Sequence, residues 1–198
     1  MEKMNVIILA AGNSNRFGTP KPFLLYDKNS TFLEKIVTLY REFGCKKIIL
    51  VMNQNHSEIL SNIYSESFLS GITVIYNRRA DLGRFYSLKL GADSVSNSDY
   101  CYIQNIDNPF TDSKTLQKLY ENRKDDAYIS PVYLNKGGHP ILLPGIIIDM
   151  IKKEININLN IKDLLSRFNK ITVDVDNDKI LANINTPFDY EIHFKKPA

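Results

Sequence analysis

The sequence predicts an α/β fold built around a largely parallel sheet. Apolar runs of strand length alternate with amphipathic stretches of helix length almost to the end of the chain, and this is the pattern of repeated β–α units. The 198 residues are enough for one such domain and too few for two of ordinary size. No internal repeat or linker interrupts them. We therefore expect residues 1–198 to form a single domain.

The first half of the chain has the clearest alternation. Its opening strand, residues 6–11, runs directly into a loop that begins and ends with glycine. Thr31 can cap a following helix whose apolar residues recur at helical spacing, and Gly44 can end it. The elements expected next are a strand over 47–52, a helix over 56–66 and a strand over 72–76.

The second half continues the pattern around one strongly apolar strand. That strand, residues 100–106, is expected to be buried, and it ends where Pro109 prevents further ladder bonds. Residues 137–148 combine a short strand with a Pro-Gly turn, and their layout stays open. The other expected elements are helices at 83–92, 113–123 and 164–168, strands at 127–132, 171–175 and 180–184, and a final helix from 186 towards 193.

Composition and charge exclude several classes of protein. The net charge is only +3, and the basic residues form short pairs rather than a stripe, so we expect no nucleic-acid partner. No apolar run approaches the ~20 residues of a membrane span. Cys45 and Cys101 fit neither a metal-ligand spacing nor a disulfide framework. Two free thiols and no signal-peptide pattern indicate a cytoplasmic protein.

The loop after the first strand carries the strongest functional signal. Gly12 and Gly18 allow the backbone to approach a polyanion, and the N–H groups of such a loop can bind phosphates. Arg16 and Lys21 supply positive charge beside it. The spacing fits neither the Walker A loop nor the dinucleotide-binding glycine pattern. On glycine content alone, an ordinary strand-to-helix turn with solvated charges is an equally good interpretation.

The complete string of residues 9–24 separates these interpretations. It reads LAAGNSNRFGTPKPFL and closely resembles the signature of the nucleotidyltransferase superfamily, LAAGxSxRMGxxKxLL. The resemblance implies that this loop binds a nucleotide and that Arg16 and Lys21 take part in catalysis. The matching positions are Leu9, Ala10, Ala11, Gly12, Ser14, Arg16, Gly18 and Lys21.

Later landmarks resemble the MobA-like branch, whose members include molybdenum cofactor cytidylyltransferase. Residues 82–91 are similar to its G-x-x-x-S-L-x-x-G pattern. The resemblance implies that Ser87 helps to hold the base and ribose, although this serine could also merely cap a helix or face solvent. For the fold, it implies a three-layer α/β/α sandwich with a mostly parallel, Rossmann-like sheet, as in the nucleotide-diphospho-sugar transferases.

Two positions resemble the metal ligands of this branch. Asp107 stands at the aspartate of its G-D-Q-P motif, where a carboxylate leaving a buried strand can bind Mg²⁺ that bridges phosphate oxygens. Asn185, in a segment similar to D-I-D-T-P-E-D, replaces the second metal aspartate and would bind the cation without adding charge. The resemblance thus implies Mg²⁺ held by both residues, with Asp107 also catalytic. Asp107 could instead cap the turn.

A third landmark points to the second substrate. The Gly-Gly-His-Pro run at 137–140 resembles the G-H-P motif of the branch, which lies near the acceptor. The resemblance implies that His139 contacts the acceptor. An equally good interpretation is that the imidazole only holds its own loop in place.

Together these resemblances imply a Mg²⁺-dependent transfer of an NMP from an NTP to a phosphate-bearing acceptor, with release of pyrophosphate. Cytidylyltransferases of the branch resemble this chain at Ala11, so CTP is the expected donor and the molybdopterin cofactor the expected acceptor. A sugar phosphate, a polyol phosphate or phosphocholine is the alternative acceptor. Because Asn183 and Asn185 lack the acidic side chains of the pattern, a non-catalytic nucleotide-binding protein is the other interpretation.

Overall fold

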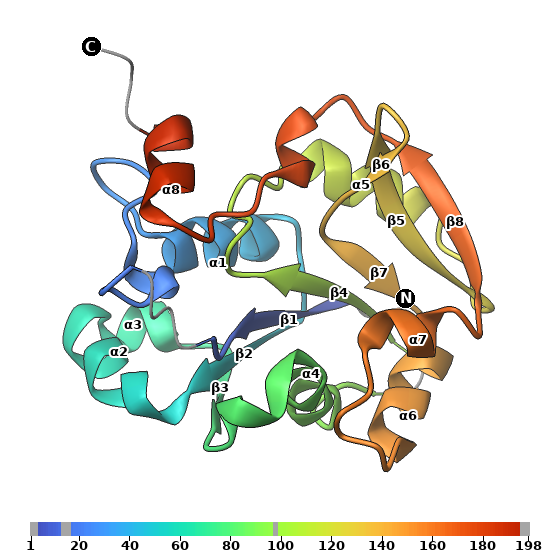
Figure 1. The fold of residues 1–198 in the computed structure, drawn as a ribbon, viewed down its shortest axis with the longest axis horizontal. Coiled ribbons are helices and arrows are strands. Elements are labelled where there is room, and N and C mark those ends of the chain that lie inside the picture. The colour runs from blue at the N-terminus through green and yellow to red at the C-terminus, as the bar shows by residue number, and fades with distance from the viewer. Residues whose placement is uncertain (1–3, 13–16, 97–98, 195–198) are drawn as a thin grey trace.

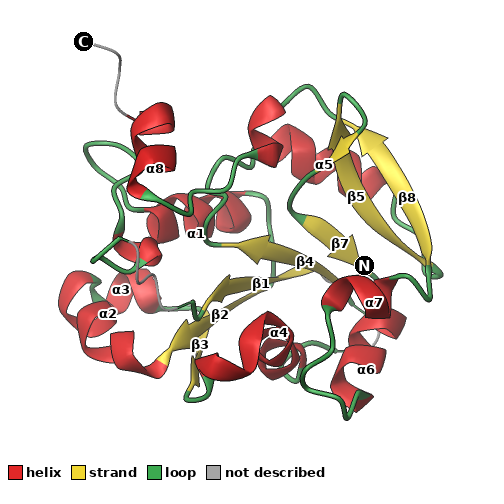
Figure 2. Ribbon diagram, in the orientation of Figure 1, coloured by secondary structure: helices red, strands yellow, loops and turns green. Residues whose placement is uncertain are grey.

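The computed structural model describes residues 4–12, 17–96 and 99–194 (Figure 1). Their strands form one eight-stranded sheet in the order β3-β2-β1-β4-β7-β5-β6, and β8 pairs with β5. Helices cover both faces of this sheet (Figure 2), so the predicted three-layer α/β/α sandwich is confirmed. The strands are β1 (Met4–Ala10), β2 (Lys47–Asn53), β3 (Ile72–Asn77), β4 (Tyr100–Asn105), β5 (Ala127–Tyr133), β6 (Lys136–Gly137), β7 (Ile141–Leu143) and β8 (Asn169–Asp174).

The sheet is mostly parallel, as the sequence predicts. β1 pairs in parallel with β2 and with β4, and β2 pairs in parallel with β3. At the other side of the sheet, β5 and β8 are also parallel. The short strand β7 runs antiparallel to β4 and β5, and β6 runs antiparallel to β5. The parallel core strands therefore direct their carboxyl ends to one edge of the sheet.

The two layers of helices follow from the alternation of side chains along the strands. Val6 and Ile8 of β1 pack on the face covered by α1, α2 and α5, whereas Ile7 and Leu9 pack on the face covered by α4, α6 and α7. The helices are α1 (Phe32–Glu42), α2 (Ser57–Ile63), α3 (Glu66–Leu69), α4 (Gly83–Ala92), α5 (Ser113–Glu121), α6 (Gly145–Lys153), α7 (Ile161–Leu165) and α8 (Pro187–Phe194).

The signals at the ends of α1 act as expected. The hydroxyl of Thr31 accepts the N–H of Glu34 at 3.2 Å, and the Glu34 carboxylate accepts the N–H of Thr31 at 2.8 Å. This reciprocal pair is a capping box. After the helix, Gly44 has a φ of +90°, which glycine adopts without steric cost.

One predicted helix is divided in two. Residues 56–66 were expected to be continuous, but α2 ends where Tyr64 adopts an extended backbone with ψ of 136°. The ring of Tyr64 is buried, and its hydroxyl is 2.6 Å from the hydroxyl of Thr31. Ser65 then caps α3 by accepting the N–H of Phe68. The tertiary contact of one tyrosine therefore interrupts the helical pattern.

The prediction of a strand over 180–184 is wrong. Residues Asp178–Leu181 form a 3-10 turn, η4, instead. The carbonyl of Ile180 accepts the side chain of Asn108 at 2.8 Å and the N–H of His139 at 3.1 Å. These two bonds tie the segment to loops rather than to a neighbouring strand. The sequence of this segment resembles a strand because it is apolar. Its isoleucines, Ile180 and Ile184, are indeed fully buried, but outside a strand.

The open segment 137–148 contains the start of an unexpected helix. Pro144 precedes the first turn of α6 with an extended backbone, a position where its missing N–H costs nothing. Ile147 and Ile148 are fully buried while Ile146 is 56% exposed. The consecutive isoleucines therefore belong to a helix with one buried face, although as a short apolar run they resemble a strand.

A close approach fixes the loop that precedes His139. A Cβ atom on Gly138 would lie 2.6 Å from Cδ1 and 2.7 Å from the carbonyl oxygen of Ile180. A Cβ atom on the adjacent Gly137 would meet nothing nearer than 3.9 Å. The loop and η4 can therefore pack together only because residue 138 has no side chain.

We expect Gly138→Ala to lower the free energy of unfolding by about 1–3 kcal/mol, since the added methyl group overpacks a contact with backbone. Urea unfolding at neutral pH measures this change. Gly137→Ala is the matched control and is expected to change stability by less than about 0.5 kcal/mol. Equal effects of the two substitutions would contradict the packing argument.

Candidate functional site

A cleft opens at the carboxyl ends of β1 and β4. Their parallel register sets Leu9 beside Asn105, and the N–H of Ile106 donates to the carbonyl of Leu9 at 3.2 Å. This pairing brings the loop after β1 next to the turn after β4. The cleft has a volume of about 430 Å³ and is lined by Leu9, Ala10, Ala11, Gly12, Lys21, Pro22, Ala80, Gly83, Arg84, Ser87, Asn105, Ile106, Asp107 and Asn185.

The cleft gathers most of the residues selected from the sequence. Ser14 and Arg16 lie outside the described residues. Gly18 is described but is not among the lining residues, and its φ of +70° is a left-handed conformation suited to glycine. His139 is likewise absent from the lining. The selected residues that line the cleft are Leu9, Ala10, Ala11, Gly12, Lys21, Ser87, Asp107 and Asn185.

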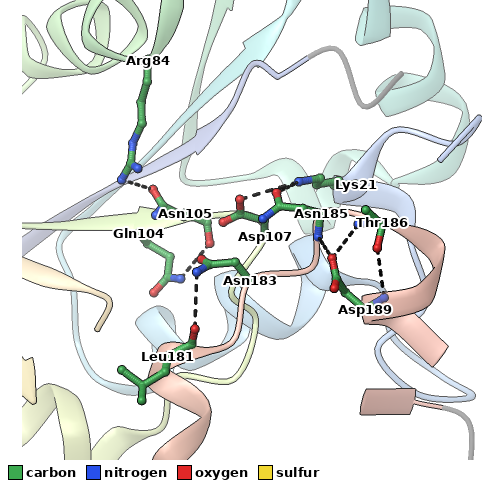
Figure 3. A network of polar contacts seen from close by, with 10 residues as sticks. All are labelled: Lys21, Arg84, Gln104, Asn105, Asp107, Leu181, Asn183, Asn185, Thr186 and Asp189. Atoms are coloured by element: carbon green, nitrogen blue, oxygen red, sulfur yellow. Dashed lines mark hydrogen bonds and ion pairs between the residues drawn. The ribbon is translucent and has the colours of Figure 1, made fainter. Parts of the chain in front are cut away.

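The ammonium group of Lys21 lies at the centre of this arrangement (Figure 3). It donates to Oδ1 of Asn185 at 2.8 Å and lies 3.6 Å from Oδ2 of Asp107. The side chains of Lys21 and Asp107 are only 15% and 25% exposed, so water and salt screen their attraction less than on an open surface. One cation therefore connects three segments that are far apart in the sequence.

The position of Asp107 is fixed by its own main chain and by its neighbour. The carbonyl of Asp107 accepts the N–H of Ile184 at 2.8 Å, and the side chain of Asn108 holds the carbonyl of Ile180. Oδ1 of Asp107 is buried and has no hydrogen-bond partner within the described part of the chain. Leaving a buried carboxylate oxygen without a hydrogen-bond donor costs free energy. This oxygen is therefore suited to bind a cation that arrives together with a ligand.

The donor atoms beside Lys21 fit a divalent metal ion. Asp107 and Asn185 both offer oxygen, the ligand atom that Mg²⁺ prefers. Across the described ranges, no group of three or more His, Cys, Asp or Glu side chains gathers into a metal cluster. A cation held by one carboxylate and one amide needs phosphate oxygens or water to complete its shell. The residues therefore fit a metal ion that binds together with a phosphorylated ligand.

Asn185 is positioned by the first turn of α8. The carboxylate of Asp189 accepts the N–H of Asn185 at 2.9 Å and that of Thr186 at 2.8 Å. In return, the hydroxyl of Thr186 accepts the N–H of Asp189 at 3.2 Å. These bonds form a capping box with Asp in place of Glu. They lower the pKa of Asp189 below its ordinary value, and the bond from the Asn185 N–H is the largest cause.

Aromatic packing fixes α8 against the rest of the fold. Phe194 stacks on Phe110 with 5.3 Å between ring centroids, and it also packs against Phe32 of α1. Tyr190 stacks on Phe194 at 4.8 Å. Because Asn185 directly precedes this helix, the aromatic cluster determines where its amide lies.

Ser87 faces the cleft from α4. Its hydroxyl accepts the side-chain amide of Asn77 at 2.9 Å and donates weakly to the carbonyl of Gly83 at 3.4 Å. The side chain is buried, and a hydroxyl has a second acceptor position. Ser87 therefore retains hydrogen-bonding capacity for a ligand.

Arg84 is a cleft residue that sequence reasoning missed. Its guanidinium donates to Oδ1 of Asn105 at 2.6 Å. Although Arg84 as a whole is exposed, desolvation of the guanidinium lowers its pKa, and the Asp107 carboxylate opposes this shift. A signal was available, because Arg84 precedes Ser87 by three residues and so shares its face of the helix.

His139 lies behind the cleft wall. Its N–H donates to the carbonyl of Ile180, and its buried Nδ1 has no hydrogen-bond partner among the residues that are described. Burial lowers the pKa of His139 to about 4, with Arg84 and Lys162 adding to the shift. The imidazole is therefore neutral at pH 7 and can offer a polar atom, but not a positive charge, to an acceptor.

A mostly parallel sandwich with a glycine-bounded loop after β1 and an aspartate after β4 is the arrangement that the sequence led us to expect of a nucleotidyltransferase. Residues 6–171 match the family model described as the MobA-like NTP transferase domain. The chain belongs to the MobA-like NTP transferase family, which confirms the resemblance read from residues 9–24 and the later landmarks.

Individual relatives are similar over nearly their whole length. The chain is 28% identical to the molybdenum cofactor cytidylyltransferase of Escherichia coli (strain K12) over 190 residues, which cover 96% of this chain and 95% of that protein. The solved structure of Rv0371c from Mycobacterium tuberculosis H37Rv has a TM-score of 0.80 at 20% identity, with 98% of this chain and 99% of that chain covered.

A third relative is more distant. The 2-C-methyl-D-erythritol 4-phosphate cytidylyltransferase of Francisella tularensis has a TM-score of 0.70 at 18% identity, and the match covers 96% of this chain and 98% of that chain. Rv0371c has also been solved in complex with manganese, with a TM-score of 0.76 at 19% identity over 98% of this chain and 100% of that chain. At these identities, the solved structures support the fold.

Within the residues that the structure describes, none of the helices is both long and apolar enough to cross a membrane.

The capping box of α8 predicts a pH-dependent contribution to stability. The pKa of Asp189 is lowered in the folded state from an ordinary value of 3.8, so its stabilisation is complete above that value and is lost as the pH falls through the folded pKa. We expect Asp189→Ala to cost about 1 kcal/mol at pH 7, and this cost to shrink towards zero at low pH.

Urea unfolding of the wild type and the variant across the acid range tests this expectation. Asp126→Ala, at an exposed aspartate before β5, is the control for a general change of charge. A stability difference that persists undiminished below the folded pKa would exclude the carboxylate as its cause.

Proposed function

We propose that this protein is a Mg²⁺-dependent cytidylyltransferase, which transfers CMP from CTP to the molybdopterin cofactor and releases pyrophosphate. Nucleotidyl transfer is the activity of the family, whereas the donor, the metal and the acceptor are our proposal. The observation that carries it is the cluster of Lys21, Asp107 and Asn185 in the cleft beside the glycine loop.

The glycine loop and Lys21 would bind the triphosphate. Gly12 lines the cleft where β1 ends, so main-chain N–H groups of the loop can approach phosphate oxygens. Phosphate oxygens are stronger partners for an ammonium group than the neutral amide of Asn185. We infer that Lys21 transfers its hydrogen bond from Asn185 to the triphosphate, with Arg16 adding a second positive charge.

This exchange would free two oxygen ligands at the moment when the nucleotide arrives. Asp107 and Asn185 would then hold Mg²⁺, which when bound neutralises charge on the α-phosphate. Rv0371c, a protein with the same fold, has been solved in complex with manganese, which supports a divalent ion as a ligand of this protein. The uncharged amide of Asn185 makes us expect weak binding of the metal in the absence of nucleotide.

The chemistry needs positioning and charge rather than a general base. The attacking acceptor phosphate is already an anion, so no proton has to be removed. Lys21 and Arg16 would stabilise the charge that develops on the phosphates, in a cleft where water is partly excluded. The protein's contribution is therefore an array of fixed charges around a bound nucleotide.

Ala11 supports CTP as the donor. Its side chain lines the cleft and is 6% exposed, and we infer that its methyl group lies where the backbone passes the base. A methyl group there would crowd a purine more than a pyrimidine, and such a contact discriminates by only ~1–3 kcal/mol. Ser87, with its remaining acceptor position, would contact the ribose or base. The names of the Escherichia coli and Francisella relatives also favour a cytidine nucleotide.

The molybdopterin cofactor is the acceptor that the comparisons favour, because the Escherichia coli relative matches almost the whole chain. A polyol phosphate is the second candidate, and the name of the Francisella relative supports it. We propose that His139 contributes to the acceptor side as a neutral hydrogen-bonding group. Both cysteines are free thiols, which supports a reducing, cytoplasmic location.

A non-catalytic nucleotide-binding protein is less well supported. Asn183 uses its side chain for a weak bond to the carbonyl of Leu181 at 3.4 Å, but Asn185 contacts Lys21 directly. A chain that had lost catalysis would have no need to keep Lys21, Asp107 and Asn185 in contact.

Measuring pyrophosphate release with each of the four NTPs, in the presence of the molybdenum cofactor, tests the proposed function. We expect CTP to have the highest kcat/KM, by about 10- to 100-fold over the purine nucleotides. A preference for GTP or ATP would exclude the proposed donor. Release with a polyol phosphate but not with the cofactor would change the acceptor, and no release with any combination would favour the non-catalytic interpretation.

Two substitutions test the metal site. Asp107→Ala is expected to lower kcat by about 100-fold or more, because it removes an important electrostatic element of the transition state. Asn185→Asp is expected to tighten Mg²⁺ binding in the presence of nucleotide, because it adds charge to a ligand position. Calorimetry with a nucleotide analogue measures the second effect. Unchanged turnover in Asp107→Ala would place the metal elsewhere.

A further inference from the structure

Arg84 lines the cleft, and among the described residues its guanidinium pairs with an amide rather than with a carboxylate. Its hydrogen-bond partner at 2.6 Å is the neutral amide of Asn105, and it forms no ion pair with a carboxylate within the described ranges. Asp107 is close enough to act on its charge, but that carboxylate already contacts Lys21. An arginine held by an amide inside a cleft is well suited to receive an anion.

Arg84 also lies close enough to His139 for its charge to act on that imidazole. Both Arg84 and Lys162 act on the buried imidazole of His139 and disfavour its protonation. The neutral imidazole leaves its Nδ1 atom without a partner in the described part of the chain. The charge of Arg84 therefore acts beyond the cleft lining, on a neutral imidazole that does not itself line the cleft.

Arg84 and Lys21 approach Asp107 from opposite sides. Figure 3 shows the Arg84 guanidinium on one side of Asp107, next to Asn105, and the Lys21 ammonium on the other side, next to Asn185. Lys21 begins η1 (Lys21–Phe23), which follows the glycine loop, whereas Arg84 extends from α4. The two cations are thus poised to bind different groups.

In-line displacement explains why two such cations are needed. If the glycine loop and Lys21 hold the β- and γ-phosphates, pyrophosphate leaves the α-phosphate towards that side. The attacking oxygen must then approach from the opposite side, which is where Arg84 lies. The guanidinium fork matches two oxygens of a phosphate group.

We propose that Arg84, oriented by Asn105, binds the phosphate group of the acceptor and aims it at the α-phosphorus of the nucleotide. This proposal rests on the proposed function and narrows the substrate class to acceptors with a terminal phosphate monoester. One acceptor oxygen forms a bond to the α-phosphorus. The bond from that phosphorus to the bridging oxygen breaks, and its electron pair leaves with pyrophosphate. Arg84 transfers no proton in this step.

Calorimetry with inorganic phosphate as the probe tests the proposal. Wild-type protein is first saturated with α,β-methylene-CTP and Mg²⁺, so that phosphate cannot enter the donor site. We expect Arg84→Gln to weaken phosphate binding by about tenfold or more, because it removes a charge-assisted pair of hydrogen bonds. Binding of the nucleotide analogue should change by less than twofold. Arg167→Gln, at an exposed arginine paired with Glu154, is the matched control and should change neither.

A second variant removes the site without removing Arg84. Asn105→Asp places a carboxylate against the guanidinium, so the arginine acquires an internal counter-ion and should lose phosphate affinity to a similar extent. Lys21→Gln should give the opposite pattern, with weaker binding of the analogue and a smaller effect on phosphate.

The outcomes separate this proposal from the proposed function. Equal phosphate affinity in the wild type and Arg84→Gln would overturn the assignment of Arg84, and so would the absence of measurable phosphate binding to the wild type. A loss of analogue binding in Arg84→Gln would assign the arginine to the donor instead. Failure of the wild type to bind the analogue would overturn the proposed function, and this inference with it.

Discussion

The parallel pairing of β1 with β4 is the constraint on which the site depends. Residues from two distant parts of the sequence meet there because their strands end at the same edge of the sheet, with Leu9 opposite Asn105. β1 is buried on both faces, and a shift of one residue would move each side chain to the opposite face, where it would meet helices packed around a side chain of different shape. Apolar packing thus determines the distance between the glycine loop and Asp107 before any polar contact forms.

Charge balance governs what the cleft can bind. The Lys21 ammonium lies 3.6 Å from the Asp107 carboxylate and neutralises its charge. When a ligand separates this pair, both charged groups can contact the ligand. A nucleotide with its metal ion brings both signs of charge and can replace this internal pair with less loss than a simple anion. Arg84 instead pairs with the neutral amide of Asn105 and forms no ion pair among the residues that the structure describes. Lys21 therefore requires a ligand that can replace Asp107, whereas Arg84 requires only an anion, although both residues line one cleft.

The sequence predicted the parallel core well, because buried parallel strands are apolar throughout and their loops carry glycine. The prediction failed where apolar residues lie outside a regular strand. Ile180 is such a residue, because its carbonyl accepts hydrogen bonds from two loops. The motif selected Lys21, Asp107 and Asn185, which the structure brings together. The contact of Arg84 with Asn105 depends on how α4 packs over β1 and its neighbours, which no local pattern encodes. The roles of all the selected site residues, and the extent of the domain, stay predictions, and Ser14 and Arg16 lie outside the described residues.

The contact between Lys21 and Asn185 joins residues 164 positions apart, and this separation has a consequence for synthesis on the ribosome. The glycine loop emerges early, together with strands that can begin to fold around it. Its amide partner emerges only with the segment that leads into α8, whose aromatic side chains then dock on α1. A nascent chain can therefore possess the loop that we propose to bind phosphate long before the residues that we propose to hold the metal are complete. Under the proposed function, turnover has to wait for the docking of that late helix.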